Sequence, residues 1–254
     1  MLDGTILNHE INMKTYGLIG YPLSHSFSKN FFTKKFEIEK INARYINIEI
    51  ENLNLFKKFI IKNNLSGVNV TSPFKSKIIN YLDFIEDSAK KIGAINTIKI
   101  VDDKLYGYNT DIIGFEKSIL PLLDNRKYAL IIGNGGASKA IQFVLNKLKI
   151  NLKIVSRNSC FDYSDINEEF INTVDIIINT TPLGTYPKIN TAPDLPYSLL
   201  NSKHLLFDLV YNPKLSLFLK KGIKQNSMVK NGLEMLHIQA DESWKIWNSN
   251  KINL

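Results

Sequence analysis

A lysine and an aspartate are the chain's best candidates for proton chemistry, because each ends a polar motif that follows a predicted strand. Lys75 ends the segment Asn-Val-Thr-Ser-Pro-Phe-Lys, and Asp111 ends Gly-Tyr-Asn-Thr-Asp. An ammonium group can deliver a proton to an oxygen or stabilise negative charge that develops there. Taken alone, each residue has a plainer explanation, since a lone lysine is usually at the surface and Asp111 is placed to cap a helix.

Hydroxyl and amide side chains occupy neighbouring motifs. Ser26 and Ser28 stand near the start of a predicted helix, where they could cap the helix or hold a carboxylate. Thr71 follows a predicted strand, and Asn96 places an amide in an otherwise apolar stretch. Because α/β proteins gather their sites at the carboxyl ends of strands, we expect these side chains to converge.

A glycine loop follows another predicted strand and opens a predicted helix. Glycine permits the tight turn and lets phosphate oxygens approach the backbone amides at the helix N-terminus. Ser138 replaces the third glycine of the dinucleotide-binding pattern and is small enough for close packing. The residues predicted to hold a pyrophosphate are Gly133, Asn134, Gly135, Gly136 and Ala137. The alternative is a strand-to-helix turn that binds no ligand.

An arginine stands where the next strand ends, at the position that usually reads the ribose. Arg157 follows Gly135 by 22 residues and lies between Ser156 and Asn158. An enzyme for NAD typically has a carboxylate there, whereas an arginine can pair with a 2′-phosphate and stack on adenine. The pattern favours NADP over NAD; the alternative is an arginine that only reaches solvent from a strand end.

The elements that must position these residues form two α/β series. In the first, the predicted strands are 16–20, 44–50 and 67–71, the helices are 27–36 and 52–62, and a hairpin joins 94–100 to 104–108. In the second, the strands are 128–132, 152–156, 175–179 and 205–210, with a helix from the glycine loop to Lys147. A helix over 111–123, broken near Pro121, connects them.

The fold class predicted is therefore α/β with two lobes. A mixed-sheet domain spans 14–110, and a Rossmann-like domain spans 111–231. The C-terminal segment 232–254 is predicted to return to the first domain as a helix. Its apolar stripe, expected to face the core, consists of Leu233, Leu236, Ala240, Trp244 and Trp247.

Composition narrows the class of protein. The 254 residues are 44% hydrophobic, enough for a substantial core, and the net charge of +8 is dispersed and forms no basic arm typical of nucleic-acid binding. The single cysteine, Cys160, excludes an internal disulfide and a cysteine-based metal cluster, and no metal site is predicted. No apolar run is long enough to span a membrane, and the polar N-terminus argues against a signal peptide, so we expect a cytoplasmic protein. Residues 1–14 are interpreted as a tail, with Met13 as a candidate natural start.

Together the motifs resemble the shikimate dehydrogenase family in identity, order and spacing over nearly the whole chain. The matching segments are 25–28, 69–75, 96–97, 107–111, 133–138, 156–158, 179–184, 208–213 and 231–240. Two positions depart from the family pattern. Lys29 stands where proline is usual, which leaves both serine hydroxyls in place, and Asn158 replaces a threonine but keeps a hydrogen-bonding group.

The resemblance implies an enzyme that reduces 3-dehydroshikimate to shikimate with NADPH, by reversible hydride transfer, in the shikimate pathway of aromatic amino-acid biosynthesis. It implies a substrate-binding, catalytic first domain and an NADP-binding second domain. Lys75 and Asp111 would flank the reacting carbon, with Lys75 as the acid. The alternative is that Lys75 stabilises the alkoxide while a water delivers the proton.

The resemblance also implies the remaining contacts. Ser26 and Ser28 would hold the substrate carboxylate, with Tyr211 nearby. The ring hydroxyls would be bound by Thr71, Asn96, Asp111 and Gln239. Further cofactor contacts would come from Thr180, Thr181, Val210, Gly232 and Met235. Gln239 follows Met235 by four residues, so the two share a helical face distinct from the tryptophan stripe.

Several alternatives stay open at this point. A quinate/shikimate dehydrogenase that accepts NAD is the nearest, although no acidic residue adjoins Arg157. The methylene-tetrahydrofolate dehydrogenases share a two-lobe plan but match these motifs poorly. A non-catalytic sensor would bind the same ligands without turnover, and a nucleic-acid-binding protein would need a basic patch with aromatic residues. The expected partner is the small-molecule substrate, and the chain is expected to be a monomer or a homodimer.

Overall fold

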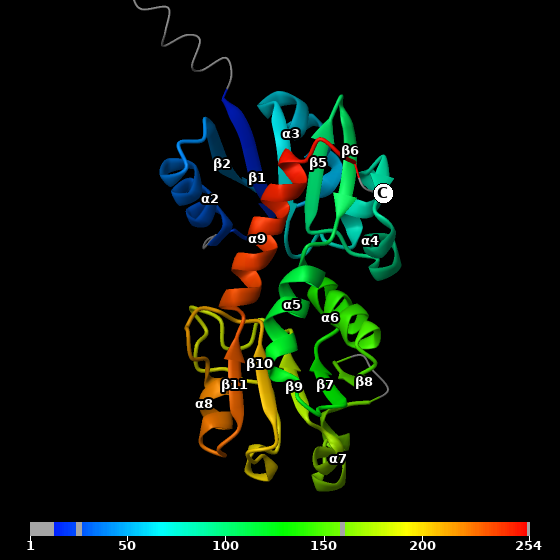
Figure 1. Ribbon diagram of the computed structural model, residues 1–254, viewed down its shortest axis with the longest axis vertical. Coiled ribbons are helices and arrows are strands. Elements are labelled where there is room, and N and C mark those ends of the chain that lie inside the picture. The colour runs from blue at the N-terminus through cyan, green and yellow to red at the C-terminus, as the bar shows by residue number, and fades with distance from the viewer. Residues whose placement is uncertain (1–12, 24–26, 158–160, 253–254) are drawn as a thin grey trace, which may run out of the picture. The chain divides into compact units, whose positions relative to one another are not determined.

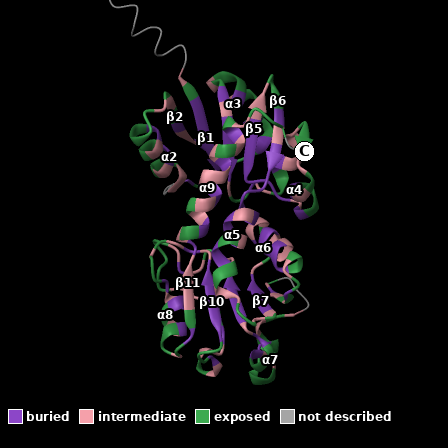
Figure 2. Cartoon of the chain, in the orientation of Figure 1, coloured by how far each residue is buried: buried purple, intermediate pink, exposed green. Residues whose placement is uncertain are grey.

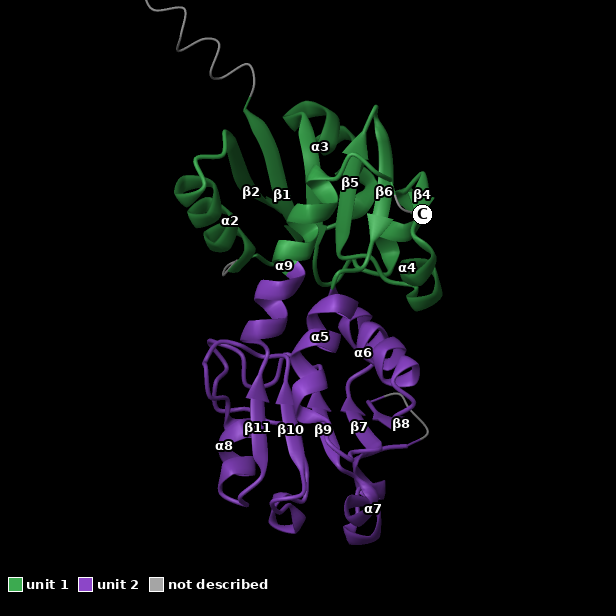
Figure 3. Cartoon of the chain, viewed as in Figure 1, with its two compact units in different colours: residues 1–110, 240–254 green, residues 111–239 purple. Residues whose placement is uncertain are grey.

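The computed structural model describes residues 13–23, 27–157 and 161–252, which divide into two compact units (Figures 1 and 3). Unit 1 comprises 1–110 and 240–254, and unit 2 comprises 111–239. Residues 1–12 of the predicted tail, Ser26 and Asn158 lie outside the described residues, whereas Lys14, which was also assigned to the tail, is already the first residue of a strand. In the part of the chain that is described, no helix is both long and apolar enough to cross a membrane.

Unit 1 is built on a six-stranded mixed sheet with the order β2-β1-β3-β5-β6-β4. Its strands are β1 (Lys14–Gly20), β2 (Ala43–Glu49), β3 (Leu65–Val70), β4 (Phe84–Ile85), β5 (Thr97–Val101) and β6 (Lys104–Tyr108). The first three strands run parallel, whereas β5 is antiparallel to both β3 and β6. The α/β part of this unit thus ends in the predicted hairpin.

Helices cover both faces of the unit 1 sheet, because side chains alternate between the faces of a strand. On one face, α2 (Phe27–Ile38) and the C-terminal part of α9 (Leu233–Asn248) cover a cluster that includes Tyr16 and Tyr45. On the other face, α3 (Phe56–Asn63) and α4 (Asp87–Ile92) cover a cluster that includes Ile19. Buried residues, purple in Figure 2, therefore run through both sides of the sheet.

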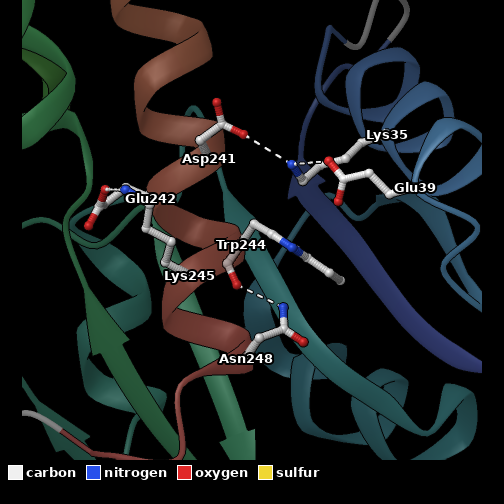
Figure 4. A network of polar contacts seen from close by, with 7 residues as sticks. All are labelled: Lys35, Glu39, Asp241, Glu242, Trp244, Lys245 and Asn248. Atoms are coloured by element: carbon white, nitrogen blue, oxygen red, sulfur yellow. Dashed lines mark hydrogen bonds and ion pairs between the residues drawn. The ribbon is translucent and has the colours of Figure 1, made fainter.

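The C-terminal part of α9 is held in unit 1 by an aromatic cluster and by polar contacts. Trp247 stacks on Tyr16 with ring centroids 4.8 Å apart, and its indole Nε1 donates to the Ile98 carbonyl at 2.9 Å. Figure 4 shows Lys35 of α2 between Glu39, the residue after the end of that helix, and Asp241 on α9; the ion pairs measure 2.7 and 3.4 Å. These contacts confirm that the last helix returns to the first domain, but only from Ala240 onward, because residues 233–239 belong to unit 2.

Unit 2 is a five-stranded, all-parallel sheet with the order β11-β10-β9-β7-β8. Its strands are β7 (Tyr128–Ile132), β8 (Asn151–Val155), β9 (Ile176–Asn179), β10 (Leu205–Asp208) and β11 (Met228–Asn231). Its helices are α5 (Asp111–Ile119), α6 (Gly136–Lys147), α7 (Glu168–Thr173) and α8 (Leu217–Ile223), with the start of α9. Every residue of β9 and β10 is buried, as expected for parallel strands covered on both faces.

The strand order creates a switch point between β7 and β9. From β7 the chain passes to β8 on one side, and it then returns to the other side to form β9. Ligands of doubly wound sheets bind outside the carboxyl ends of the strands at such a point. The segments that follow β7 and β9 therefore mark the place where a ligand of unit 2 is expected.

Several predicted boundaries were wrong for local physical reasons. The helix predicted from residue 52 begins as a separate 3-10 turn, Leu53–Leu55, and the hairpin strand begins at Thr97, after Ala94. The connecting helix ends at Ile119, because Pro121 cannot continue it and only a 3-10 turn follows. In α9, only Ala240 and Trp247 of the predicted stripe are fully buried. The elements β4, β11, α4, α7 and α8 were not predicted.

Candidate active site and cofactor site

In unit 1 the segment after β3 holds Thr71 and Lys75 in a tight turn. The Thr71 amide donates to the Ile19 carbonyl at 2.8 Å, and the Phe74 amide donates back to the Thr71 carbonyl at 3.0 Å. Phe74 is 2% exposed and anchors the turn in the core. Gly20, at the end of β1, is needed here because a Cβ would collide with the Thr71 methyl. Lys75, next to Phe74, is half-buried.

Asn96 lies beside this turn and has a fixed orientation. The Ile95 amide donates to the Lys75 carbonyl at 2.7 Å, which brings the two segments together. The Asn96 side chain is buried, donates from Nδ2 to Thr110 Oγ1 at 3.0 Å, and accepts from the Thr110 amide at 2.7 Å. Thr71, Lys75 and Asn96 therefore gather at the edge of the sheet where β3 ends.

A buried polar network behind Asn96 was not predicted. Asn69 Nδ2 donates to Ser243 Oγ at 3.0 Å and to Thr97 Oγ1 at 3.2 Å. Ser243, on α9, also contacts Thr97 Oγ1 at 2.8 Å and Thr110 Oγ1 at 3.2 Å. All four side chains are buried, so each needs these partners. The network fixes the backbone on both sides of Asn96.

The same network extends to the serine motif through a tyrosine. The Tyr45 hydroxyl donates to Asn69 Oδ1 at 2.8 Å. Burial raises the pKa of Tyr45 well above its usual value, and a hydrogen bond with Ser28 opposes part of that rise. Ser28, at the start of α2, is thus linked through Tyr45 and Asn69 to the Asn96 segment. Ser26, the other predicted serine, lies outside the described residues.

In unit 2, Asp111 is the first residue of α5 and is 5% exposed. One turn later, Gly114 packs against α9, where a Cβ would lie 2.7 Å from the Met235 carbonyl oxygen and 3.2 Å from Gln239 Cβ. Met235 and Gln239 are themselves buried, and Gln239 Nε2 donates to the Leu236 carbonyl at 2.9 Å. The structure thus brings α5 next to the helical face that carries Met235 and Gln239.

The glycine loop lies at the switch point, between β7 and α6. Gly133 has φ of 103°, and a Cβ there would lie 2.7 Å from Thr180 Oγ1, so both conformation and space require glycine. Ser138 Oγ donates to the Gly133 carbonyl at 2.8 Å and closes the turn.

Gly135 differs, because its backbone is extended and, among the described residues, no heavy atom lies within 4 Å of a Cβ built there. Gly135 is the N-cap of α6, and in the described structure no side chain of the cap accepts a hydrogen bond from the first amides of the helix. Amides at the start of the 12-residue α6, beside open space, suit the pyrophosphate of a dinucleotide. Asn134 is exposed, and Gly136 and Ala137 are half-buried in the first part of this helix.

The segment after β9 lies next to the loop, and the segment after β10 adjoins that of β9, since the Leu209 amide donates to the Asn179 carbonyl at 3.0 Å. Thr180 Oγ1 donates to the Ile132 carbonyl at 2.7 Å, and the Thr181 amide and hydroxyl both donate to Asn179 Oδ1. The Gly232 amide donates to the Val210 carbonyl at 3.3 Å, and a Cβ on Gly232 would collide with the Leu209 carbonyl. Half-buried Tyr211 follows Val210.

Arg157 ends the segment after β8 and is exposed, while Ser156 is half-buried and Asn158 lies outside the described residues. Burial is the main cause that raises the pKa of Tyr163, and the charge of Arg157 acts against it. The guanidinium therefore lies within electrostatic reach of the Tyr163 hydroxyl. Its exposure leaves it accessible to a phosphate group.

The predicted residues thus divide between the units. Ser28, Thr71, Lys75 and Asn96 belong to unit 1, and the residues predicted to hold the cofactor belong to unit 2 together with Asp111, Tyr211 and Gln239. A doubly wound sheet with a glycine loop at its switch point, in one chain with a smaller mixed-sheet unit, defines the class of two-domain dehydrogenases that use nicotinamide dinucleotides.

Comparisons with known proteins identify the family within this class. A family model described as the shikimate dehydrogenase substrate binding domain matches residues 18–98. A protein of Clostridium beijerinckii named shikimate dehydrogenase (NADP(+)) is 42% identical, and the match covers 92% of each chain. The chain belongs to the shikimate dehydrogenase family.

Solved structures agree with this assignment and confirm the fold class. The crystal structure of shikimate dehydrogenase 1 from Peptoclostridium difficile has a TM-score of 0.83 and 38% identity, over 94% of this chain and 93% of that one. The enzyme of Thermus thermophilus, crystallised with NADP(H) and shikimate, has a TM-score of 0.81 and 25% identity, over 93% and 94%.

Proposed function

We propose that this protein reduces 3-dehydroshikimate to shikimate with NADPH, as an NADP-dependent shikimate dehydrogenase of aromatic amino-acid biosynthesis. The observation that carries the proposal is the 42% identity, over 92% of the chain, to a protein named for this activity. The geometry supports it independently, because Thr71, Lys75 and Asn96 form a polar edge in unit 1 and the glycine loop lies at the switch point of unit 2.

The cofactor residues are proposed from the fit of unit 2 to a dinucleotide. The amides from Gly135 to Ala137 would bind the pyrophosphate, where the structure leaves space above Gly135. Arg157, with Ser156 and Asn158, would bind the 2′-phosphate, which NAD lacks. Gly133, Asn134, Thr180, Thr181, Val210, Gly232 and Met235 complete the proposed contacts. NADPH, when bound, supplies the hydride.

The substrate residues are proposed from the membership of the chain in the shikimate dehydrogenase family. Ser26 and Ser28 would bind the carboxylate of the ring acid, with Tyr211 nearby. Thr71, Asn96, Asp111 and Gln239 would bind ring hydroxyls. In Asn96, both amide atoms already contact Thr110, so its orientation is set before any substrate binds.

Proton transfer is assigned to Lys75, with Asp111 as its partner. Reduction of a ketone requires a proton on oxygen as well as a hydride on carbon. The Lys75 ammonium would donate that proton, and the Asp111 carboxylate would orient the ammonium. The tight turn that ends in Phe74 limits the freedom of the Lys75 backbone, which helps to hold the amine in place.

The test is the oxidation of NADPH by purified protein with 3-dehydroshikimate, for wild type, Lys75→Ala and Lys77→Ala. Lys77 is an exposed lysine two residues further along the same segment, so it is a matched control for the loss of one positive charge. We expect Lys75→Ala to lower kcat by about 100-fold or more, as for loss of a general acid, and Lys77→Ala to retain wild-type turnover. Wild-type protein that binds both ligands without turnover would contradict the proposal and favour a sensor.

A further inference from the structure

Unit 2 contains a fully buried carboxylate that the proposed reaction does not use. Asp208, the last residue of β10, has 0% exposure. Its Oδ1 accepts from Asn179 Nδ2 at 2.9 Å and from the Val210 amide at 3.0 Å, and its Oδ2 accepts from Ser216 Oγ at 2.5 Å. An ionised group in a protein core requires such donors to offset its desolvation.

Asn179 connects this carboxylate to the segment that follows β9. Because Asn179 Nδ2 donates to Asp208, its Oδ1 must point the other way, where it accepts from the Thr181 amide at 3.0 Å and from Thr181 Oγ1 at 2.6 Å. The same Nδ2 also donates to the Leu183 carbonyl at 3.3 Å. One amide side chain therefore sets the path of the chain from Thr181 to Leu183.

The carboxylate also acts directly on the segment after its own strand. Its bond to the Val210 amide fixes the turn that leaves β10, and Gly232 in turn donates to the Val210 carbonyl. Since β9 and β10 are neighbours in the sheet (Figure 1), one side chain controls both segments that leave their carboxyl ends. Thr181 and Val210, at the near ends of these segments, are proposed cofactor contacts.

We propose that Asp208 is a positioning residue for the cofactor site: through Asn179 and the Val210 amide it holds the segments after β9 and β10 in the conformation that binds NADP. This inference rests on the proposed function, since it deepens the account of the same site. It predicts that loss of Asp208 weakens cofactor binding more than a comparable loss elsewhere in the sheet.

The matched control is Asp175, at the opposite end of the same sheet. Its carboxylate accepts from the Lys127 and Tyr128 amides at 2.8 and 3.0 Å, so it also joins segments of unit 2 through backbone donors. The Asp175 side chain bonds to neither of the segments that follow β9 and β10 in the described structure. Asp175→Ala therefore reports the effect of losing a structural carboxylate without moving the cofactor segments.

The variants are Asp208→Ala, Asp208→Asn, Asn179→Ala and Asp175→Ala. Calorimetric titration gives the Kd for NADP+, thermal unfolding gives stability, and kinetics give KM for 3-dehydroshikimate. We expect Asp208→Ala and Asn179→Ala to raise Kd by about tenfold to 100-fold, as for loss of one or two buried hydrogen bonds. Asp208→Asn keeps the oxygen that accepts from Asn179 and Val210, so its Kd should return to within about threefold of wild type.

Two results would overturn the proposal. One is a Kd for NADP+ in folded Asp208→Ala that matches that of Asp175→Ala, which would show a structural role alone. The other applies if Asp208→Ala does not fold: an unchanged Kd in Asn179→Ala would then show that the relay does not shape the site. Binding of NADP+ is measured without substrate, so failure of wild type to reduce 3-dehydroshikimate would contradict the proposed function and leave this comparison intact.

Discussion

Two glycines in one turn allow cofactor binding to be separated from folding. Gly135 has φ of −90° and ψ of −174°, an extended conformation open to any residue, and a Cβ there would meet no described atom within 4 Å. Gly133 has φ of 103°, and a Cβ there would lie 2.7 Å from Thr180 Oγ1. Gly135→Ala should therefore fold like wild type, whereas Gly133→Ala should be destabilised.

The magnitudes follow from the local geometry. At Gly135, which precedes α6, alanine is a poorer N-cap than glycine by roughly 0.5–1 kcal/mol, and a less flexible unfolded chain offsets about the same amount. At Gly133, a residue other than glycine costs about 1–3 kcal/mol in backbone strain, and the contact with Thr180 adds to it. The methyl group of Gly135→Ala would project into the proposed pyrophosphate site. Loss of one charge-assisted hydrogen bond there, about 1.5–3 kcal/mol, raises Kd by about tenfold to 100-fold.

Urea unfolding measures the free energy of unfolding, and calorimetric titration measures the Kd for NADP+. Adenosine 2′-monophosphate, which lacks the pyrophosphate, is the control ligand and should bind equally to wild type and Gly135→Ala. If folded Gly135→Ala binds NADP+ as tightly as wild type, no phosphate approaches that backbone, and the assignment of the loop is wrong.

Four further results are expected. Trp247→Ala should lower the free energy of unfolding by about 3–5 kcal/mol in urea, because it removes a buried ring that stacks on Tyr16; a loss below about 1 kcal/mol would contradict its role as the anchor of α9. Ser243→Ala should raise KM for 3-dehydroshikimate while the Kd for NADP+ stays unchanged, since its network supports Asn96 in unit 1. Arg157→Gln should raise the KM for NADPH by about tenfold or more and leave the KM for NADH unchanged. An equal rise in the KM for both cofactors would refute the 2′-phosphate contact. Burial raises the pKa of Asp208 from 3.8 to about 6. Between these two pH values the native state therefore binds more protons than the unfolded chain, so the free energy of unfolding of the wild type falls as the pH rises through this range. Asp208→Asn removes this pH dependence. Measured by urea unfolding, the free energy of unfolding of the variant minus that of the wild type should therefore rise by about 2 kcal/mol between about pH 4.5 and about pH 7. A difference that does not change with pH would refute the raised pKa.

The sequence predicted the long, strongly patterned elements of the fold. Buried parallel strands such as 128–132 are continuous apolar runs, and the glycine loop marks the start of α6, so both were recognisable. The elements that were not predicted are short or mostly polar. The strand β11 reads Met-Val-Lys-Asn and has no fully buried residue, because it lies at the edge of the sheet.

The site was predictable only as far as local motifs reach. Lys75, Asn96 and the glycine loop lie in segments whose residue types suggest chemistry. The hydrogen-bond network that supports Asn96 could not be predicted, because Asn69 and Ser243 are 174 residues apart and only the tertiary fold brings them together. Asp208 was similarly hidden, since the apolar run before it predicts a strand but does not show which donors surround its last residue.

The central claim is hydride transfer between the ring acid and the nicotinamide, and isotope transfer tests it most directly. Wild-type protein is incubated with NADP+ and shikimate that carries deuterium on the carbon bearing the oxidised hydroxyl, and the products are analysed by mass spectrometry. The account predicts that 3-dehydroshikimate forms without the label and that the reduced cofactor carries it. Absence of labelled reduced cofactor, with both ligands bound, would contradict the account.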